Sequence, residues 1–272
     1  MKLKAVALVL ALLLITLACI YLFVAHPWWF PAGVSAHAAA LDHQFKVAFL
    51  LLGILFLAGQ LVLVVMIGRA RGNRPSRNSR GHWGLEIAWT AIIAGIFFWF
   101  NVSGERLWSH AMFHPADANA VHVEVTGAQF QWYFRYAGAD GILGRTDAQQ
   151  FAKPEEGNPL GIDPGDPAGK DDIVSTAMVL PVGREADLSL RSQDVIHSVF
   201  IPAMRFKQDA VPGMDIHAHF TPTQTGTFEL ACSQLCGLGH YRMTALVRVV
   251  SDQEFNAWMK MRENTGPARE TK

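Results

Sequence analysis

Charged residues and cysteines are both scarce in this sequence. Lys, Arg, Asp and Glu make up 17% of the 272 residues, whereas a typical soluble protein carries about 25%. Basic and acidic residues balance, with a formal net charge of zero. A general nucleic-acid binder normally carries a basic face, so the balance argues against that class. The three cysteines are too few, and odd in number, for a disulfide framework.

Long apolar runs take up much of the first part of the chain. They cover residues 5–25, 47–68 and 85–102, and each approaches the roughly 20 residues that a helix needs to cross a bilayer. We therefore expect a membrane anchor over residues 1–105 with three spans. A folded domain is predicted over residues 106–262, with a short tail over residues 263–272.

The charges between these runs predict an orientation. The segment from Arg69 to His82 holds five arginines and no acidic residue, which by the positive-inside rule places it in the cytoplasm. Lys2 and Lys4 place the N-terminus on the same side. The domain after the third run is then expected on the periplasmic or outer side of a bacterial plasma membrane. The first run is either a retained span or a cleaved signal peptide, and its length favours a span.

The pattern after residue 105 is typical of β-structure. Residues 121–136 alternate in polarity and are rich in Val, Phe, Tyr and Trp, as strands are. Residues 138–172 are rich in Gly, Pro and Asp and predict a long surface excursion. Further short strand-like runs cover residues 177–182, 185–191, 198–201, 214–220, 226–231 and 245–250. This pattern predicts an antiparallel sandwich or barrel, with a short helix over residues 252–262.

A twelve-residue run near the end gathers metal-binding side chains. It contains Cys232, Cys236, His240 and Met243. Thiolate, thioether and imidazole together suit copper, and a weak methionine ligand is typical of copper electron-transfer sites. Two thiolates can bridge two copper ions, and His197, at the start of a strand-like run, is the candidate for a second imidazole. A structural zinc ion and a disulfide between the two cysteines are the alternatives.

These motifs resemble the copper A (CuA) domain of cytochrome c oxidase subunit II. The resemblance rests on C-S-x-x-C-G-x-x-H-x-x-M at 232–243, D-V-I-H-S at 194–198, K-Q-D-A-V-P-G-M at 207–214 and L-E-I-A-W-T at 85–90. It covers the chain from the second apolar run to about residue 260. The implied fold is a set of N-terminal transmembrane helices followed by an all-β cupredoxin-like sandwich or barrel.

The resemblance also implies a role for each ligand. The implied metal ligands of two copper ions are His197, Cys232, Gln234 through its carbonyl, Cys236, His240 and Met243. The implied function is the electron-entry subunit of a haem-copper oxygen reductase. It would take electrons from a c-type cytochrome and pass them to haem in subunit I, where oxygen is reduced.

Two positions depart from the family pattern. Gln234 stands where many members have a glutamate that helps to bind magnesium at the boundary with subunit I, so the interface magnesium is in question. Phe130 stands where the family has its electron-entry tryptophan, in the same aromatic strand as Trp132. We assign electron entry to these two aromatic residues.

Four acidic residues are further candidates. Asp194, Asp209 and Asp215 lie near the ligands in sequence and could attract a cationic cytochrome, because complementary charge mainly raises encounter rates. Glu86 begins the third apolar run, where a carboxylate is costly unless it is near water or paired. It matches a family glutamate at the entrance of a proton path, with an interfacial anchor as the alternative.

Two other functions remain open from the sequence. The same module could serve a related nitric-oxide reductase, because the acceptor chemistry lies in another subunit. A copper carrier or storage protein is a different class, although carriers favour exposed and exchangeable sites. The absence of C-x-x-C-H excludes a fused cytochrome c of the usual type.

Overall fold

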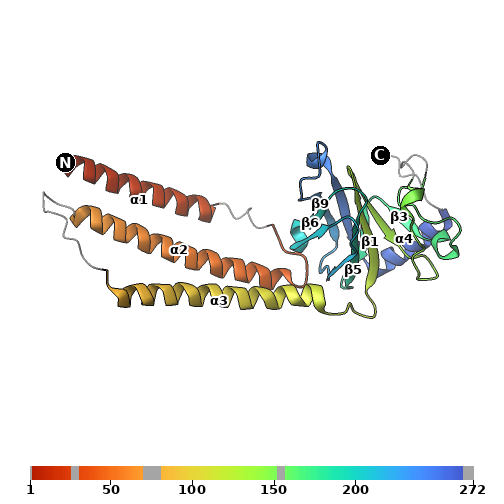
Figure 1. The fold of residues 1–272 in the computed structure, drawn as a ribbon, viewed down its shortest axis with the longest axis horizontal. Helices are drawn as coiled ribbons and strands as arrows, with labels where there is room; N and C mark the ends of the chain where they lie inside the picture. Colours follow the sequence, from red (N-terminus) through yellow and green to blue (C-terminus); the bar gives the residue numbers. More distant parts are fainter. Residues whose placement is uncertain (1, 26–30, 70–80, 152–156, 266–272) are drawn as a thin grey trace. The chain divides into compact units, whose positions relative to one another are not determined.

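The computed structural model describes residues 2–25, 31–69, 81–151 and 157–265. The described residues form two compact units (Figure 1). One is helical and comes from residues 1–31 and 40–106, and the other, called the β-unit below, comes from residues 32–39 and 107–272. The predicted linker between Arg69 and His82 falls mostly on residues 70–80, which lie outside the described residues.

Three long helices carry the apolar runs. They are α1 (Lys2–Ala25), α2 (Ala38–Arg69) and α3 (Trp83–Phe113), and each is long and apolar enough to cross a membrane. Helices α2 and α3 extend beyond the predicted runs. Hydropathy marks only the part of a helix that suits hydrocarbon, whereas backbone hydrogen bonding continues into the polar flanking residues.

Ten strands of the β-unit form two five-stranded sheets. The first sheet has the order β3 (Ile173–Ser175), β2 (Gln131–Tyr136), β1 (Val121–Ala128), β5 (Ala186–Ser192) and β8 (Ile216–Phe220). The second has the order β4 (Met178–Pro181), β10 (Thr244–Val250), β9 (Gly226–Cys232), β6 (His197–Ile201) and β7 (Phe206–Ala210). A final helix, α4, covers Asp252–Thr265. The predicted all-β sandwich is confirmed.

The prediction of a purely antiparallel arrangement is wrong at two strand pairs. Strand β1 pairs with β5, and β10 with β4, in parallel. Parallel partners need a long connection between them. The chain between β1 and β5 contains β2 and the predicted excursion, and it is long enough for a parallel pair. The alternation of polarity does not reveal the direction of a strand, so the sequence could not predict this pairing.

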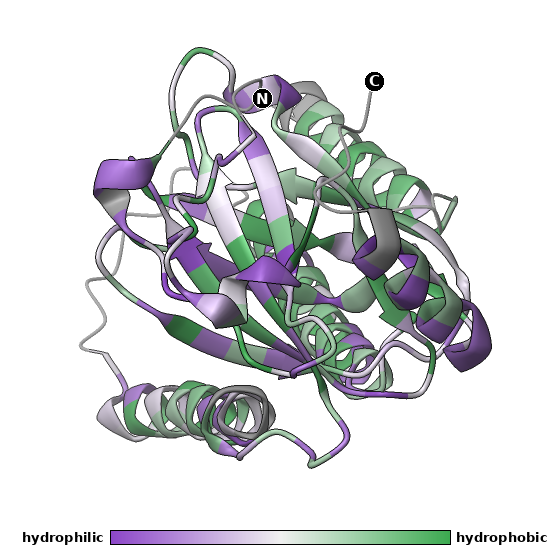
Figure 2. Ribbon diagram, turned by 90° about the vertical axis from the view of Figure 1, so that its right-hand side faces the viewer, coloured by the Kyte–Doolittle hydropathy of each residue, from purple (hydrophilic) through white to green (hydrophobic). Residues whose placement is uncertain are grey.

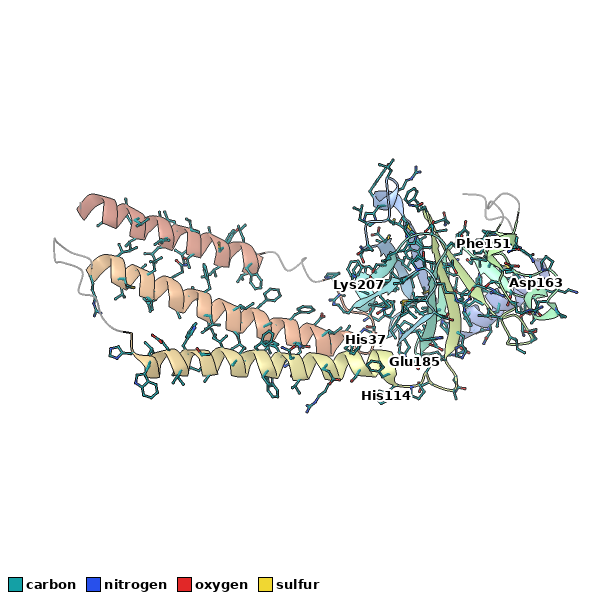
Figure 3. All side chains as sticks on the ribbon, viewed as in Figure 1. His37, His114, Phe151, Asp163, Glu185 and Lys207 are labelled. Carbon is teal, nitrogen blue, oxygen red and sulfur yellow. The ribbon has the colours of Figure 1, made fainter. Side chains whose placement is uncertain are left out.

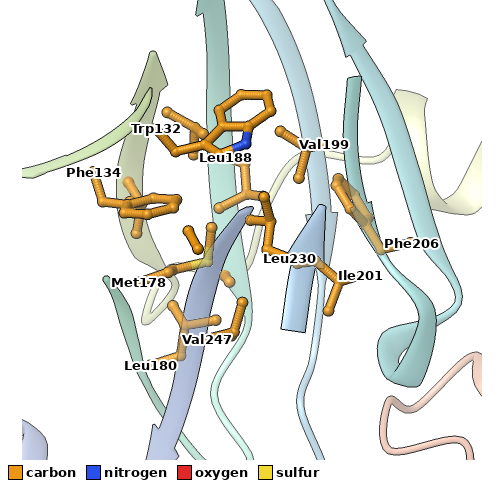
Figure 4. Packing of buried hydrophobic residues seen from close by; sticks show 14 of the residues in the cluster. Trp132, Phe134, Met178, Leu180, Leu188, Val199, Ile201, Phe206, Leu230 and Val247 are labelled. Carbon is orange, nitrogen blue, oxygen red and sulfur yellow. The ribbon is translucent and has the colours of Figure 1, made fainter. Parts of the chain in front are cut away.

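The core lies between the two sheets (Figure 4). Buried and more exposed residues alternate along β5 and β10, as a period of two requires, and Figure 2 shows both hydropathy colours along the strands. Buried side chains of the first sheet include Trp132, Phe134 and Leu188, which pack against those of Val199 and Leu230 in the second. This packing gives the loops at the sheet ends a rigid base.

A short segment before α2 is part of the β-unit. Residues 32–39 group with it, and Val34 is buried. The Val34 N–H donates to Ala203 O at 2.8 Å, and Thr223 N–H donates to Val34 O at 2.8 Å. The Ser35 hydroxyl donates to Met204 O at 2.6 Å. A segment within the range predicted as membrane anchor therefore completes the sandwich.

The predicted excursion is fastened to the first sheet by a buried arginine. Arg135 Nε donates to Asp172 Oδ2 at 3.0 Å, and its Nη1 lies 3.3 Å from Glu124 Oε1. Arg135 also donates to Gly144 O, and Gly144 N–H donates to Asp172 at 3.0 Å. Phe151 and Asp163 mark the outer part of this excursion in Figure 3. Charged and backbone groups around Arg135 therefore fasten the excursion to the first sheet at Gly144 and Asp172.

Candidate metal centre

Two neighbouring strands bring the predicted ligands together. Strand β6 begins at His197 and β9 ends at Cys232, and the two strands pair with Val199 opposite Cys232. The loop after β9 then makes one 3₁₀ turn over His240–Arg242 before β10 starts. This connection returns the chain to the same end of the sheet, so the loop residues face the start of β6.

The donor atoms of the predicted ligands converge. Cys232 Sγ lies 3.8 Å from Cys236 Sγ and 3.9 Å from His197 Nδ1. Cys236 Sγ lies 3.6 Å from His240 Nδ1 and 3.8 Å from Met243 Sδ. The backbone oxygen of Gln234 lies 3.2 Å from Cys232 Sγ. The structure thus gathers all the sequence-predicted ligand groups at one place.

This arrangement fits a metal better than a disulfide. The 3.8 Å between the two sulfurs is far from the disulfide bond length of about 2.05 Å, and both cysteines are free. Ligands on one tetrahedral ion, with bonds of about 2.0–2.3 Å, lie roughly 3.5 Å apart. His197, Cys232 and Cys236 offer ligand atoms all within 4.8 Å of one another, and all three are buried.

A carboxylate fixes the orientation of His197. Asp194 Oδ1 lies 2.7 Å from His197 Nε2, so Nε2 carries the proton and Nδ1 turns a lone pair toward Cys232. Carboxylate–histidine pairs of this kind hold metal-binding imidazoles in the required tautomer. Burial raises the pKa of Asp194, but hydrogen bonds from Gln129 N–H, His197 and Val195 N–H outweigh it, so the pKa is lowered overall. The carboxylate stays ionised at neutral pH.

The thiol of Cys236 is protonated when no metal is bound. Burial raises the pKa of Cys236 to about 11, with further contributions from the neighbouring Cys232. A metal ligand must be a thiolate, so binding at Cys236 releases a proton to solvent.

Both predicted electron-entry residues lie against the ligands. Trp132 is fully buried, and its ring lies edge-on to His197 with centroids 5.8 Å apart. Phe130 is half-buried and packs against the ligand loop. A Cβ atom on Gly239 would overlap the Phe130 ring, so a glycine is needed at that position for the two segments to approach.

The predicted docking acids already have partners. Asp194 holds His197, Asp215 Oδ2 accepts from Arg191 at 2.7 Å, and Asp209 Oδ1 lies 3.2 Å from Lys207 Nζ. Each acid therefore contributes less attraction than a free carboxylate would. Glu86 is exposed in the first turn of α3, where a negative charge also favours the helix N-terminus.

Sequence reasoning missed an apolar surface within the ligand loop. Leu235, Leu238 and Tyr241 are 77%, 97% and 82% exposed, although they lie between ligands that are buried or half-buried. A groove of 940 Å³ lies beside Phe130, and its other lining residues include Tyr133, Pro159, Gln193, Arg242 and Leu246. The spacing of the ligands could have predicted this surface. When the ligand side chains of a short loop point inward, the side chains between them must point outward.

Known proteins of one family match this chain. The model of the cytochrome c oxidase subunit II periplasmic domain matches residues 121–250. The alternative cytochrome c oxidase subunit 2 of Bradyrhizobium diazoefficiens is 34% identical over 268 residues, covering 95% of this chain and 92% of that protein. A probable cytochrome c oxidase subunit 2 of Rickettsia bellii is 29% identical over 211 residues, covering 76% and 72%.

Among solved structures, the periplasmic domain of cytochrome oxidase subunit II from Bradyrhizobium japonicum is 29% identical. The match covers 56% of this chain and 98% of that one, with a TM-score of 0.41. The long match to the first relative and the family model agree with the resemblance predicted from the motifs. The chain belongs to the cytochrome c oxidase subunit II family, and it is therefore a subunit of an oxidoreductase complex.

Proposed function

We propose that this chain is the electron-entry subunit of a haem-copper oxygen reductase. It takes single electrons from a c-type cytochrome at a binuclear copper centre and passes them to haem in subunit I. The observation that carries the proposal is the convergence of two thiols, two imidazoles, a thioether and a backbone oxygen, with neighbouring donors 3.2–3.9 Å apart.

The pairing of donors supports two metal ions. His197 and the Gln234 carbonyl lie beside Cys232, whereas His240 and Met243 lie beside Cys236. Each thiol thus has one imidazole and one weak donor of its own. A buried thioether favours copper over zinc, because zinc sites draw on Cys, His and carboxylates. Copper bound here would supply a one-electron couple.

The protein's part in electron transfer is to hold the donors still. His197 and Met243 are fully buried, and both cysteines are nearly so, which keeps water away from most of the ligand atoms. The ligands lie at the ends of paired strands above the packed core, so their positions change little when charge changes. We assign electron entry to Phe130 and Trp132, and donor steering to Asp194, Asp209 and Asp215.

The helices support a membrane anchor. We place the apolar parts of α1, α2 and α3 in a bacterial plasma membrane, as the three spans of the anchor of residues 1–105. The copper domain of residues 106–262 then lies on the outer side, followed by the tail of residues 263–272. Glu86 would lie at the cytoplasmic entrance of a proton path into subunit I. Labelling of residues 70–80 from outside intact cells would contradict this topology.

Gln234 gives a separate expectation for the interface magnesium. Its backbone oxygen faces Cys232, which supports the copper role, and its exposed side chain is a neutral amide. Magnesium prefers carboxylate ligands. We therefore propose that residue 234 contributes nothing to a magnesium site in this chain.

Metal analysis and spectroscopy of the purified full-length chain test the proposal. The expected result is two copper ions per chain and a mixed-valence electron paramagnetic resonance (EPR) spectrum. A single copper, or mainly zinc, contradicts it. A copper carrier would show exchangeable copper without the mixed-valence signal. Oxygen and nitric-oxide turnover by the purified complex separates the oxygen reductase from a nitric-oxide reductase.

A further inference from the structure

Gln129 makes contact with both segments that supply ligands. It lies just after β1, in the turn between β1 and β2 that is closed by the Ala128–Gln131 pair. Its backbone N–H donates to Asp194 Oδ2 at 2.7 Å. Its side-chain Nε2 donates to the backbone oxygen of Cys236 at 2.5 Å. One residue thereby joins the segment before His197 to the loop after β9.

Each of these bonds acts on a ligand. The first holds the carboxylate that orients His197. The second fixes the peptide unit of Cys236, and therefore the direction of the thiol that faces Cys232. Gly237 makes room for the amide, because a Cβ atom there would lie only 3.0 Å from Gln129 Nε2. The amide of Gln129 thus depends on two loop residues, Cys236 as its acceptor and Gly237 for the space it occupies.

A second glutamine in the same hairpin shows that this contact is not a general property of the turn. Gln131 Nε2 donates to Trp132 O at 3.3 Å, within its own strand. Gln129 and Gln131 have the same side chain and nearly the same position along the chain. They differ in whether the amide reaches the ligand loop, so Gln131 is a matched control.

We propose that Gln129 is a positioning residue that sets the reduction potential and the copper retention of the centre. Its side chain does so through the Cys236 peptide, whereas its backbone N–H keeps the bond to Asp194 in every variant. This inference rests on the proposed copper function. The amide N–H points its positive end toward Cys236, which stabilises an added electron nearby. Removing the amide should lower the potential, and a carboxylate at the same place should lower it further.

The test compares variants of the full-length chain in detergent, with Cys19→Ser as the background so that only the site thiols react. The variants are Gln129→Ala, Gln129→Glu, Gln131→Ala and Gln131→Glu. We expect the midpoint potential to fall from wild type to Gln129→Ala to Gln129→Glu. In competition with a chelator, the apparent copper affinity of the Gln129 variants should fall about 10- to 100-fold, the usual effect of removing a group that orients metal ligands. Both Gln131 variants should match wild type.

Two results overturn the proposal. One is that both Gln129 variants keep the wild-type potential and copper retention. The other is that Gln131→Glu lowers the potential as much as Gln129→Glu, because the charge alone would then explain the shift. A merely structural role predicts lost copper without this ordered change in potential.

A copper-free measurement separates this proposal from the proposed function. If the wild-type chain gives no mixed-valence signal, the copper function fails. The rate of thiol labelling in the metal-free chain then decides the positioning role. Faster labelling of Cys236 in Gln129→Ala than in Gln131→Ala supports it, and equal rates overturn it.

Discussion

Two clusters of largely buried polar and ligand side chains lie in the same β-unit, and they differ in what their side chains interact with. The arginine cluster consists of Arg135, Glu124, Asp172 and Arg191, in which two cations face two carboxylates. The ligand cluster consists of His197, Cys232, Cys236, His240 and Met243. In the first, opposite charges pair with one another, and Arg135 and Asp172 also bond to the Gly144 peptide, although the buried Asp172 Oδ1 and Arg191 Nε atoms make no hydrogen bond.

The ligand cluster has no such internal balance. Its sulfur and imidazole nitrogen atoms face one another at 3.6–3.9 Å, and sulfur is a weak hydrogen-bond partner. Burying such groups together brings little stability unless something binds them. A buried cluster of paired opposite charges therefore indicates a structural role, whereas thiols, a thioether and imidazoles that face one another indicate a metal site.

The largest effect is expected when a bridging thiol is removed. Cys236→Ser should abolish the mixed-valence signal and reduce copper from two ions per chain to one or none, because a serine hydroxyl is a poor copper ligand. Metal analysis and EPR check this. Cys19→Ser, at an exposed position in α1, is the control and should keep both ions. A binuclear signal in Cys236→Ser would remove the proposed bridging role.

Breaking the arginine cluster should cost stability but not copper specificity. Arg135→Met leaves Asp172 and Glu124 buried without their partner, which typically destabilises by about 3–5 kcal/mol. Denaturant unfolding of the copper-loaded chain measures the loss. Arg145→Met, at an exposed ion pair of the same excursion, is the control and should unfold at nearly the wild-type denaturant concentration. Equal midpoints for the two variants would show that the arginine cluster is not a structural lock.

Metal removal should affect only the ligand cluster. A ligand that binds the folded state alone, at a free concentration of about 100 times its dissociation constant, stabilises by about 2.7 kcal/mol. We expect chelation to lower the unfolding free energy by at least that amount and to speed hydrogen exchange around Cys232. Exchange around Glu124 should change little. Equal acceleration at both places would mean that the clusters are not independent.

The smallest effect concerns the exposed rim of the arginine cluster. Partial burial raises the pKa of Asp215, but hydrogen bonds from Arg191 and Ser189 and the charge of Arg191 outweigh it, so the pKa is lowered. A lowered folded-state pKa gives stability that is present above the unfolded value of about 3.9. That stability is lost as the pH falls through the folded-state pKa.

Asp215→Asn should therefore destabilise by less than about 1 kcal/mol near neutral pH, since the pair is partly exposed. The difference from wild type should begin to shrink below about pH 4, near the unfolded pKa, and should disappear below the lowered folded-state pKa. Unfolding curves over this pH range are the measurement. A difference that stays constant down to the lowest pH would assign the effect to packing and not to charge.

The sequence predicted much of the fold and of the ligand set. The alternation of polarity located most of the strands, and the apolar runs located all three long helices. It missed β3, which has only three residues, and β7, in which Phe206 and Ala210 are buried but the polar residues 207–209 between them hide the pattern. It also missed residues 32–39 as part of the sandwich, because Val34 and Ser35 are buried through contacts with Ala203, Met204 and Thr223.

The sequence by itself determined which donor atoms are present, since copper chemistry follows from the residue types and from the close spacing of Cys232, Cys236, His240 and Met243. Only the tertiary structure decided their partners. The β6–β9 pairing brings His197 to Cys232, and Gln129 reaches Asp194 and Cys236 across 65 and 107 residues of chain. The physical reason is that the type of each donor atom is a property of a single residue and can be read directly from the sequence. The position of each donor depends on which strands pair and pack, and this cannot be read from the distance between residues along the chain.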